Sequence, residues 1–205
     1  RYRSNNAWSC PIVIRVPVGG YIHGALCHSQ SIDGYFMHLP GIYIAYPSCA
    51  VDAKGLLKMA CRMNDPVIFM EHKGLYRQNY AATQEPDEEY VLPFGKGRIV
   101  NRGDELTLIT WGAMVQKSLD AIRSLALSDG LIEVIDLRTL NPVDLDLIKT
   151  SIMKTSKVLI VHEDNMTNGP GAEISAIISD KFFELIDGPI KRVAAKDSPV
   201  PFNWH

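Results

Sequence analysis

Val158-Leu-Ile-Val161 is an uninterrupted apolar run in the second half of the 205-residue sequence. A strand that helices cover on both faces of a parallel sheet has such a continuous run, whereas a half-exposed strand alternates apolar and polar residues. Segments with the apolar spacing of helices stand before and after this run. The stretch therefore predicts an open α/β domain with helices on both faces of its sheet.

The same alternation of short apolar runs and helical segments fills most of the chain. In the second half, the sequence predicts strands at residues 106–111, 132–137, 158–161 and 190–194, and helices at residues 115–127, 145–153 and 172–185. In the first half, it predicts strands at residues 12–16, 42–46 and 67–70, and a helix at residues 51–63. Strands that alternate with helices in this way are typical of parallel sheets with crossover helices.

Residues 74–97 interrupt this alternation. They are mostly polar and show little periodicity, and residues 84–89 form their most acidic stretch. A segment of this kind is typical of a connection between two domains. The sequence thus predicts two α/β units joined by a linker.

The composition is that of a globular chain without a strongly charged partner. Hydrophobic residues make up 46% of the sequence, and 21 Lys and Arg residues nearly balance 23 Asp and Glu residues. Neither nucleic acid nor a membrane surface is therefore expected as a partner. No apolar stretch approaches the ~20 residues of a membrane span, and residues 1–4 lack the apolar core of a signal peptide.

Four cysteines are widely spaced and surrounded by apolar or small residues: Cys10, Cys27, Cys49 and Cys61. This pattern contains no CxxC pair and favours buried thiols over disulfides. We expect reduced cysteines and a reducing compartment.

The loop after the first predicted strand, residues 17–30, is the richest in residues that could carry chemistry. It combines glycines, which permit close backbone approach to a ligand, with His23 and His28, but it matches no nucleotide-binding fingerprint. Ligands of open α/β sheets bind beyond the carboxyl ends of the strands. His28 could therefore transfer protons near neutral pH, or it could be hydrogen-bonded for structural reasons only.

A second candidate pair, His162 and Glu163, follows the 158–161 strand. The pair invites a metal or acid/base role, but no third ligand is spaced to join it, and a structural role is favoured. Together with Asn165 and residues 169–171, the pair is expected to form a loop at a subunit interface.

Several segments in a fixed order resemble the beta subunit of the thiamin-diphosphate-dependent decarboxylating component of 2-oxo acid dehydrogenase complexes. In the first half, the segments are Gly24-Ala-Leu-Cys-His-Ser-Gln-Ser31, His38-Leu-Pro-Gly-Ile42, Asp52-Ala-Lys-Gly-Leu-Leu57 and Asn64-Asp-Pro66. In the second half, they are Trp111-Gly112, Val134-Ile-Asp-Leu-Arg-Thr139, Lys154-Thr155, His162-Glu163, Gly171-Ala-Glu-Ile174 and Lys196-Asp-Ser-Pro199. The resemblance covers essentially the whole chain.

The resemblance implies a particular domain order. Residues 1–80 correspond to the second half of the pyrimidine-side, transketolase-like domain, residues 81–95 to the linker, and residues 96–205 to a transketolase C-terminal-like domain that is shortened at its end. The glutamate that activates the aminopyrimidine ring in this family lies upstream of Ile12. We therefore expect the active site to be incomplete in this chain, and the chain to be inactive alone.

Members of the family decarboxylate a 2-oxo acid on thiamin diphosphate and pass the acyl group to a lipoyl arm. By resemblance, His28 is the active-site histidine that assists this transfer. Thiamin diphosphate with magnesium would be bound mainly outside this chain. The implied partners are an alpha subunit or alpha-type region, a second beta subunit, the lipoyl acyltransferase core and the 2-oxo acid substrate, in the cytoplasm of bacteria or the mitochondrial matrix of eukaryotes.

The resemblance also implies a monovalent cation, normally potassium, held by backbone carbonyls. The matching positions lie on the first strand and around the end of the 51–63 helix: Ile12, Ala60, Cys61, Met63 and Asp65. A helix C-terminus exposes unpaired carbonyls that suit a hard cation. Ordinary hydration of the same carbonyls is the alternative.

Residues 24–31 and Tyr76-Arg77 are closer to the branched-chain, 2-oxoisovalerate type than to the pyruvate type. A pyruvate or acetoin dehydrogenase beta subunit is the alternative within the family. Transketolase-like transferases share the two-domain architecture, but the sequence at His28 argues against them. A further hypothesis is that the region from about Lys96 acts mainly as an assembly module.

Overall fold

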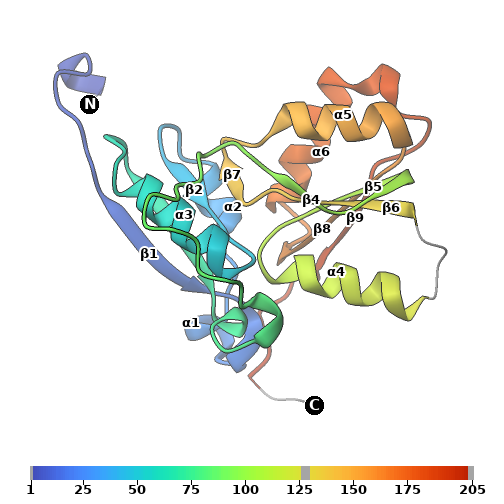
Figure 1. Ribbon diagram of the computed structural model, residues 1–205, viewed down its shortest axis with the longest axis horizontal. Helices are drawn as coiled ribbons and strands as arrows, with labels where there is room; N and C mark the ends of the chain where they lie inside the picture. Colours follow the sequence, from blue (N-terminus) through green and yellow to red (C-terminus); the bar gives the residue numbers. More distant parts are fainter. Residues whose placement is uncertain (1, 126–129, 203–205) are drawn as a thin grey trace.

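The computed structural model describes residues 2–125 and 130–202, and these form two parallel-rich sheets with helices around them (Figure 1). The predicted α/β fold class is confirmed. No helix among the described residues is long and apolar enough to cross a membrane.

The first sheet has the strand order β1-β3-β2-β7. Its strands are β1 (Val13–Val18), β2 (Tyr43–Ala45), β3 (Val67–His72) and β7 (Thr139–Asn141). The strands β1, β3 and β2 are parallel, whereas β7 comes from the second half of the chain and pairs antiparallel with β2. Its helices are α1 (Ala25–His28), α2 (Asp33–Met37) and α3 (Ala50–Ala60).

The second sheet has the order β4-β6-β5-β8-β9. Its strands are β4 (Arg98–Asn101), β5 (Gly103–Thr110), β6 (Gly130–Asp136), β8 (Val158–Asn165) and β9 (Lys191–Ala195). Helix α4 (Ala113–Ser124) lies on one face, and α5 (Leu145–Thr155) and α6 (Pro170–Lys181) lie on the other (Figure 1). Single 3-10 turns occur at Tyr2–Ser4, Gly20–Ile22, Lys73–Leu75, Asn79–Ala81 and Phe183–Leu185.

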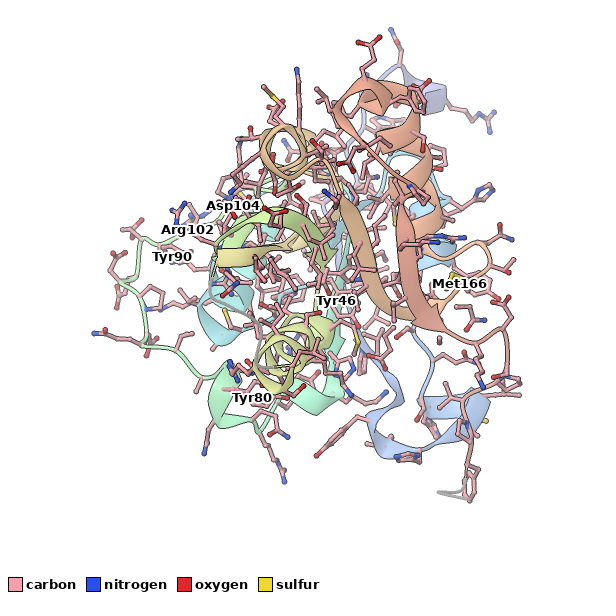
Figure 2. The ribbon with its side chains drawn as sticks, turned by 90° about the vertical axis from the view of Figure 1, so that its right-hand side faces the viewer. Tyr46, Tyr80, Tyr90, Arg102, Asp104 and Met166 are labelled. Carbon is pink, nitrogen blue, oxygen red and sulfur yellow. The ribbon has the colours of Figure 1, made fainter. Side chains whose placement is uncertain are left out.

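One apolar core joins the two halves. Ile109 and Ile160 of the second sheet are fully buried and belong to the same cluster as Ile44 and Met70 of the first sheet. Figure 2 shows Tyr46 in the middle of the molecule, and its backbone amide donates to a carbonyl of the second half, at Arg138. The two sheets are therefore positioned relative to one another by packing as well as by the chain connection.

The linker region packs against α3. The Leu92 amide donates to the Gly55 carbonyl, and a Cβ at Gly55 would lie 2.5 Å from the Tyr90 ring. Glu85 of the acidic stretch pairs with Lys54, also on α3. These contacts hold the linker along α3. The linker sequence has little periodicity and did not predict them.

The structure corrects two expectations from the sequence. Cys10, Cys27 and Cys61 are exposed and only Cys49 is partly covered, so the prediction of buried thiols is wrong for three of the four. Small residues next to a cysteine in the sequence do not show that its side chain is buried. Cys27 lies in the single turn of α1, and Cys61 caps the C-terminus of α3. The predicted helix 115–127 begins two residues earlier, and its residues 126–127 lie outside the described residues.

Candidate functional site

The loop after β1 reaches the surface at the carboxyl end of the first sheet. It contains the turn Gly20–Ile22 and then α1, whose last residue is His28. The His28 side chain is exposed and does not enter the core. Ser29 and Gln30, which follow, line a pocket of about 220 Å³ together with Glu163 and Lys196 of the second half. His28 therefore stands on the surface beside a junction between the two halves.

The backbone on either side of His28 is tied down by hydrogen bonds. The Gly19 amide donates to the Gln30 carbonyl at 3.1 Å, which closes the base of the loop. The Gly24 amide donates to Ser29 Oγ at 2.6 Å, and Lys73 Nζ donates to the His28 carbonyl at 2.6 Å. These bonds fix the main chain that carries the imidazole.

A histidine–carboxylate pair lies under this loop. His72, the last residue of β3, places Nε2 2.6 Å from Glu163 Oε2 on β8, and Glu163 Oε1 accepts from the Gly20 amide at 2.6 Å. Burial alone would raise the pKa of Glu163, but the hydrogen bonds from the His72 ring and the Gly20 amide hold it below its usual value. Glu163 is therefore an anion near neutral pH.

His72 also contacts the loop through its ring. Gly19 has φ +98°, and a Cβ there would lie 2.2 Å from His72 Nε2. The loop can pass over the buried ring only because this residue is glycine. The sequence singled out these glycines but gave no sign that His72 supports them, because the two segments are separated by about 50 residues.

A second buried group lies behind the loop. Asp33, the first residue of α2, accepts from Trp111 Nε1 at 3.0 Å. Burial, together with the charge of nearby Asp164, raises the pKa of Asp33 to about 7. The Trp111 ring stacks on His162 with centroids 5.4 Å apart, and burial lowers the pKa of His162 to about 4.

His162 and Glu163 are adjacent in sequence but have different surroundings. Both residues lie in strand β8 and not in a loop, and His162 is 2% exposed with its ring packed within the chain; a subunit interface beside them stays a prediction. Alternate residues of a strand point to opposite faces, which sends Glu163 toward the β1 loop and His162 toward Trp111. Among the described residues, no group of three or more His, Cys, Asp or Glu is arranged to hold a metal ion.

The candidate cation positions are brought together. Cys61 caps the C-terminus of α3, and the chain returns through Met63 and Asp65 into β3 beside Ile12. The Ile12 carbonyl accepts from the Val67 amide at 2.8 Å, and the Ala60 carbonyl accepts from the Met63 amide at 3.2 Å. A carbonyl oxygen has two lone pairs, so both oxygens retain one for a cation.

Comparison with known families agrees with this architecture. The family model described as "Transketolase, pyrimidine binding domain" matches residues 1–79, and "Transketolase, C-terminal domain" matches residues 95–205. Fold and loop thus define an α/β protein of the transketolase type. The chain belongs to this family and fits its beta-type region, the part found in 2-oxo acid dehydrogenase beta subunits, and the predicted resemblance is confirmed.

Two curated relatives from Bacillus subtilis (strain 168) illustrate the similarity. The chain is 48% identical over 201 residues to the 2-oxoisovalerate dehydrogenase subunit beta, and 42% identical over 204 residues to the pyruvate dehydrogenase E1 component subunit beta. These alignments cover 98% and 99% of the chain, which spans only 61% and 62% of the relatives. A solved structure titled "Split gene transketolase, inactive beta4 tetramer" matches with a TM-score of 0.73 at 20% identity, over 94% of this chain and 61% of that one, and supports the fold.

Proposed function

We propose that the chain is the beta-subunit portion of a branched-chain 2-oxo acid (2-oxoisovalerate) dehydrogenase. The proposed reaction is oxidative decarboxylation on thiamin diphosphate with acyl transfer to lipoyl groups. One observation carries the proposal: the loop that matches the family's active-site motif presents an exposed His28 at the carboxyl end of the sheet. The 48% identity to a 2-oxoisovalerate dehydrogenase beta subunit supports the substrate class.

Thiamin diphosphate, when bound, supplies the stabilisation of the carbanion formed on decarboxylation. We propose that the described residues of this chain contact one side of the cofactor and do not enclose it. The His28 imidazole is exposed on a fixed main chain, where it can hold or give a proton to a group bound against the loop. We propose that an alpha-type region, a second beta subunit and magnesium complete the site, and that the lipoyl acyltransferase core receives the acyl group.

His28→Ala, made in the enzyme assembled with its alpha-type partner, should lower acyl transfer to a lipoyl group by roughly 100-fold or more, since a positioned acid or base contributes 10²–10⁴-fold. Binding of thiamin diphosphate should change little. Single-turnover acylation of a lipoyl domain and a cofactor titration would separate the two effects. His38→Ala, also exposed and in the same half of the chain, is the matched control. An unchanged acylation rate would remove His28 from the mechanism.

The substrate is tested by direct competition. A branched-chain enzyme should show a higher kcat/KM for 3-methyl-2-oxobutanoate than for pyruvate. The pyruvate dehydrogenase alternative, at 42% identity, predicts the reverse. Neither result would disturb the role proposed for His28, because both reactions end in the same acyl transfer.

The assembly role of the second half is the other candidate function. Phe183 follows α6, Met153 lies on α5 and Leu125 follows α4, and their side chains are 70%, 63% and 65% exposed. Large exposed apolar side chains favour protein contacts. We keep residues 1–80, 81–95 and 96–205 as the proposed division into pyrimidine-side domain, linker and C-terminal domain, the last being the proposed assembly module.

A potassium ion at Ile12, Ala60, Cys61, Met63 and Asp65 would stabilise the folded chain. A ligand at about 100 times its Kd adds about 2.7 kcal/mol of stability. We expect a higher melting temperature in potassium chloride than in tetramethylammonium chloride at equal ionic strength, because backbone carbonyl oxygens can coordinate potassium directly whereas methyl groups shield the charge of tetramethylammonium. Equal melting temperatures in the two salts up to molar concentration would count against the site.

A further inference from the structure

We propose that Glu163 is a positioning residue for the His28 loop, and that His72 fixes its carboxylate. The inference rests on the proposed role of His28. Glu163 belongs to β8 in the second half of the chain, whereas the loop and His72 belong to the first half. The second half would thus act on the chemistry without touching the reacting atoms.

The hydrogen-bond geometry allows only one arrangement of the pair. His72 Nδ1 accepts from the Gly74 amide at 3.0 Å, so in the neutral ring the proton is on Nε2. That proton points at Glu163 Oε2, 2.6 Å away. The other carboxylate oxygen, Oε1, accepts from the Gly20 amide. Both oxygens therefore act as acceptors, and both donors are fixed by the backbone or by a buried ring.

The His72–Glu163 pair can hold the loop in place because the loop passes over the His72 ring. Gly19 passes directly over the His72 ring, and Gly20 is the next residue and the first of the turn that leads into α1. Lys73, adjacent to His72, donates to the His28 carbonyl at the far end of the same segment. Residues 72 and 73 and Glu163 thus hold the segment 19–28 at both ends. A small displacement of a catalytic group can lower a rate by about 100-fold.

Glu163→Gln tests this arrangement with little change in shape. A glutamine offers one acceptor oxygen and one donor group, and here both positions require an acceptor. Either the Gly20 amide or the His72 ring must therefore lose its partner. Amide hydrogen exchange in residues 19–28 should become faster in the variant, while Glu173→Gln, an exposed change on α6 of the same half, should leave it unchanged.

In the assembled enzyme, Glu163→Gln should lower acyl transfer to a lipoyl domain by ~10- to ~100-fold. Decarboxylation measured with an artificial one-electron oxidant should fall less than twofold. In the His28→Ala background, Glu163→Gln should cause little further loss, because the residue it positions is gone. His72→Gln keeps both oxygens of Glu163 but removes the ring that fixes them. This variant should also lower acyl transfer more than decarboxylation, by a smaller factor than Glu163→Gln.

These variants test the role of Glu163 separately from the role of His28. If His28→Ala leaves acylation intact, the proposed role of His28 fails first. If His28→Ala is damaging but Glu163→Gln lowers decarboxylation and acylation equally, or adds its full loss to that of His28→Ala, Glu163 has only a general structural role and the inference is wrong. If Glu163→Gln does not assemble, an unaltered rate in His72→Gln would also overturn it.

Discussion

Replacement of Arg98 by methionine should lower the free energy of unfolding by roughly 3 to 5 kcal/mol, because it leaves buried Asp136 without an ion-pair partner and buried Asp52 with only one of its two arginines. The Arg98 guanidinium lies 3.1 Å from Asp52 and 3.4 Å from Asp136, and both aspartates have 0% side-chain exposure. Asp52 is on α3 in the first half, whereas Arg98 is on β4 in the second. The variant should therefore also loosen the junction between the halves.

The remaining cation cannot replace the lost one. Arg138 pairs with the other oxygen of Asp52 at 3.1 Å, and Ser48 donates to Asp136. Asp136 would keep the Ser48 hydroxyl but lose its ion-pair partner at 3.4 Å. Urea unfolding followed by tryptophan fluorescence would measure the change.

Arg123→Met is the matched control for this prediction. Arg123 pairs with Asp120 on the exposed surface of α4, where side-chain exposures are 66% and 57%. An exposed pair of this kind contributes roughly 0 to 1 kcal/mol. If Arg98→Met lowers the free energy of unfolding no more than Arg123→Met does, water solvates the buried carboxylates in place of the arginine and the prediction is wrong.

The fold class was predictable because apolar patterns are local. Runs such as residues 158–161 and 67–70 identify buried strands without reference to any other part of the chain. The short strands β4 and β7 were not predicted, because each is defined by its partner: β7 pairs with β2, almost 100 residues away in sequence. Three residues of pairing leave no periodicity to detect.

The candidate site divides in the same way. His28 could be named from its motif and its place after a strand, and the structure leaves it exposed as that role requires. The support from His72 and Glu163 could not be named, since their contact is set by where β3 and β8 end in two different sheets. The sequence also gives no sign that Asp52 is the centre of an ion-pair network, because Arg98 and Arg138 reach it only through tertiary packing.

Asp33 is a buried acid whose proton affects stability over a defined pH range. Its folded-state pKa is about 7, against an ordinary value of 3.8, because burial and the neighbouring Asp164 charge disfavour the anion. The folded state therefore binds the proton more tightly than the unfolded state. The stabilising contribution of the neutral acid is present below about pH 4 and is lost as the pH rises through about 7. Glu163, whose pKa is lowered, gives the opposite trend at lower pH.

Asp33→Asn should remove this pH dependence. Asparagine stays neutral and retains an oxygen that can accept from Trp111 Nε1. A difference of about three pKa units corresponds to roughly 4 kcal/mol, so the variant should be more stable than the parent by up to that amount at pH 8 and nearly equal to it at pH 4. Melting curves from pH 4 to pH 8 would follow the difference, and other titrating groups cancel because both proteins carry them. Asp104→Asn, an exposed change labelled in Figure 2, is the matched control. If the Asp33 variant differs from the parent by the same amount at every pH, the acid is already ionised at low pH and the junction tolerates a buried anion beside Trp111.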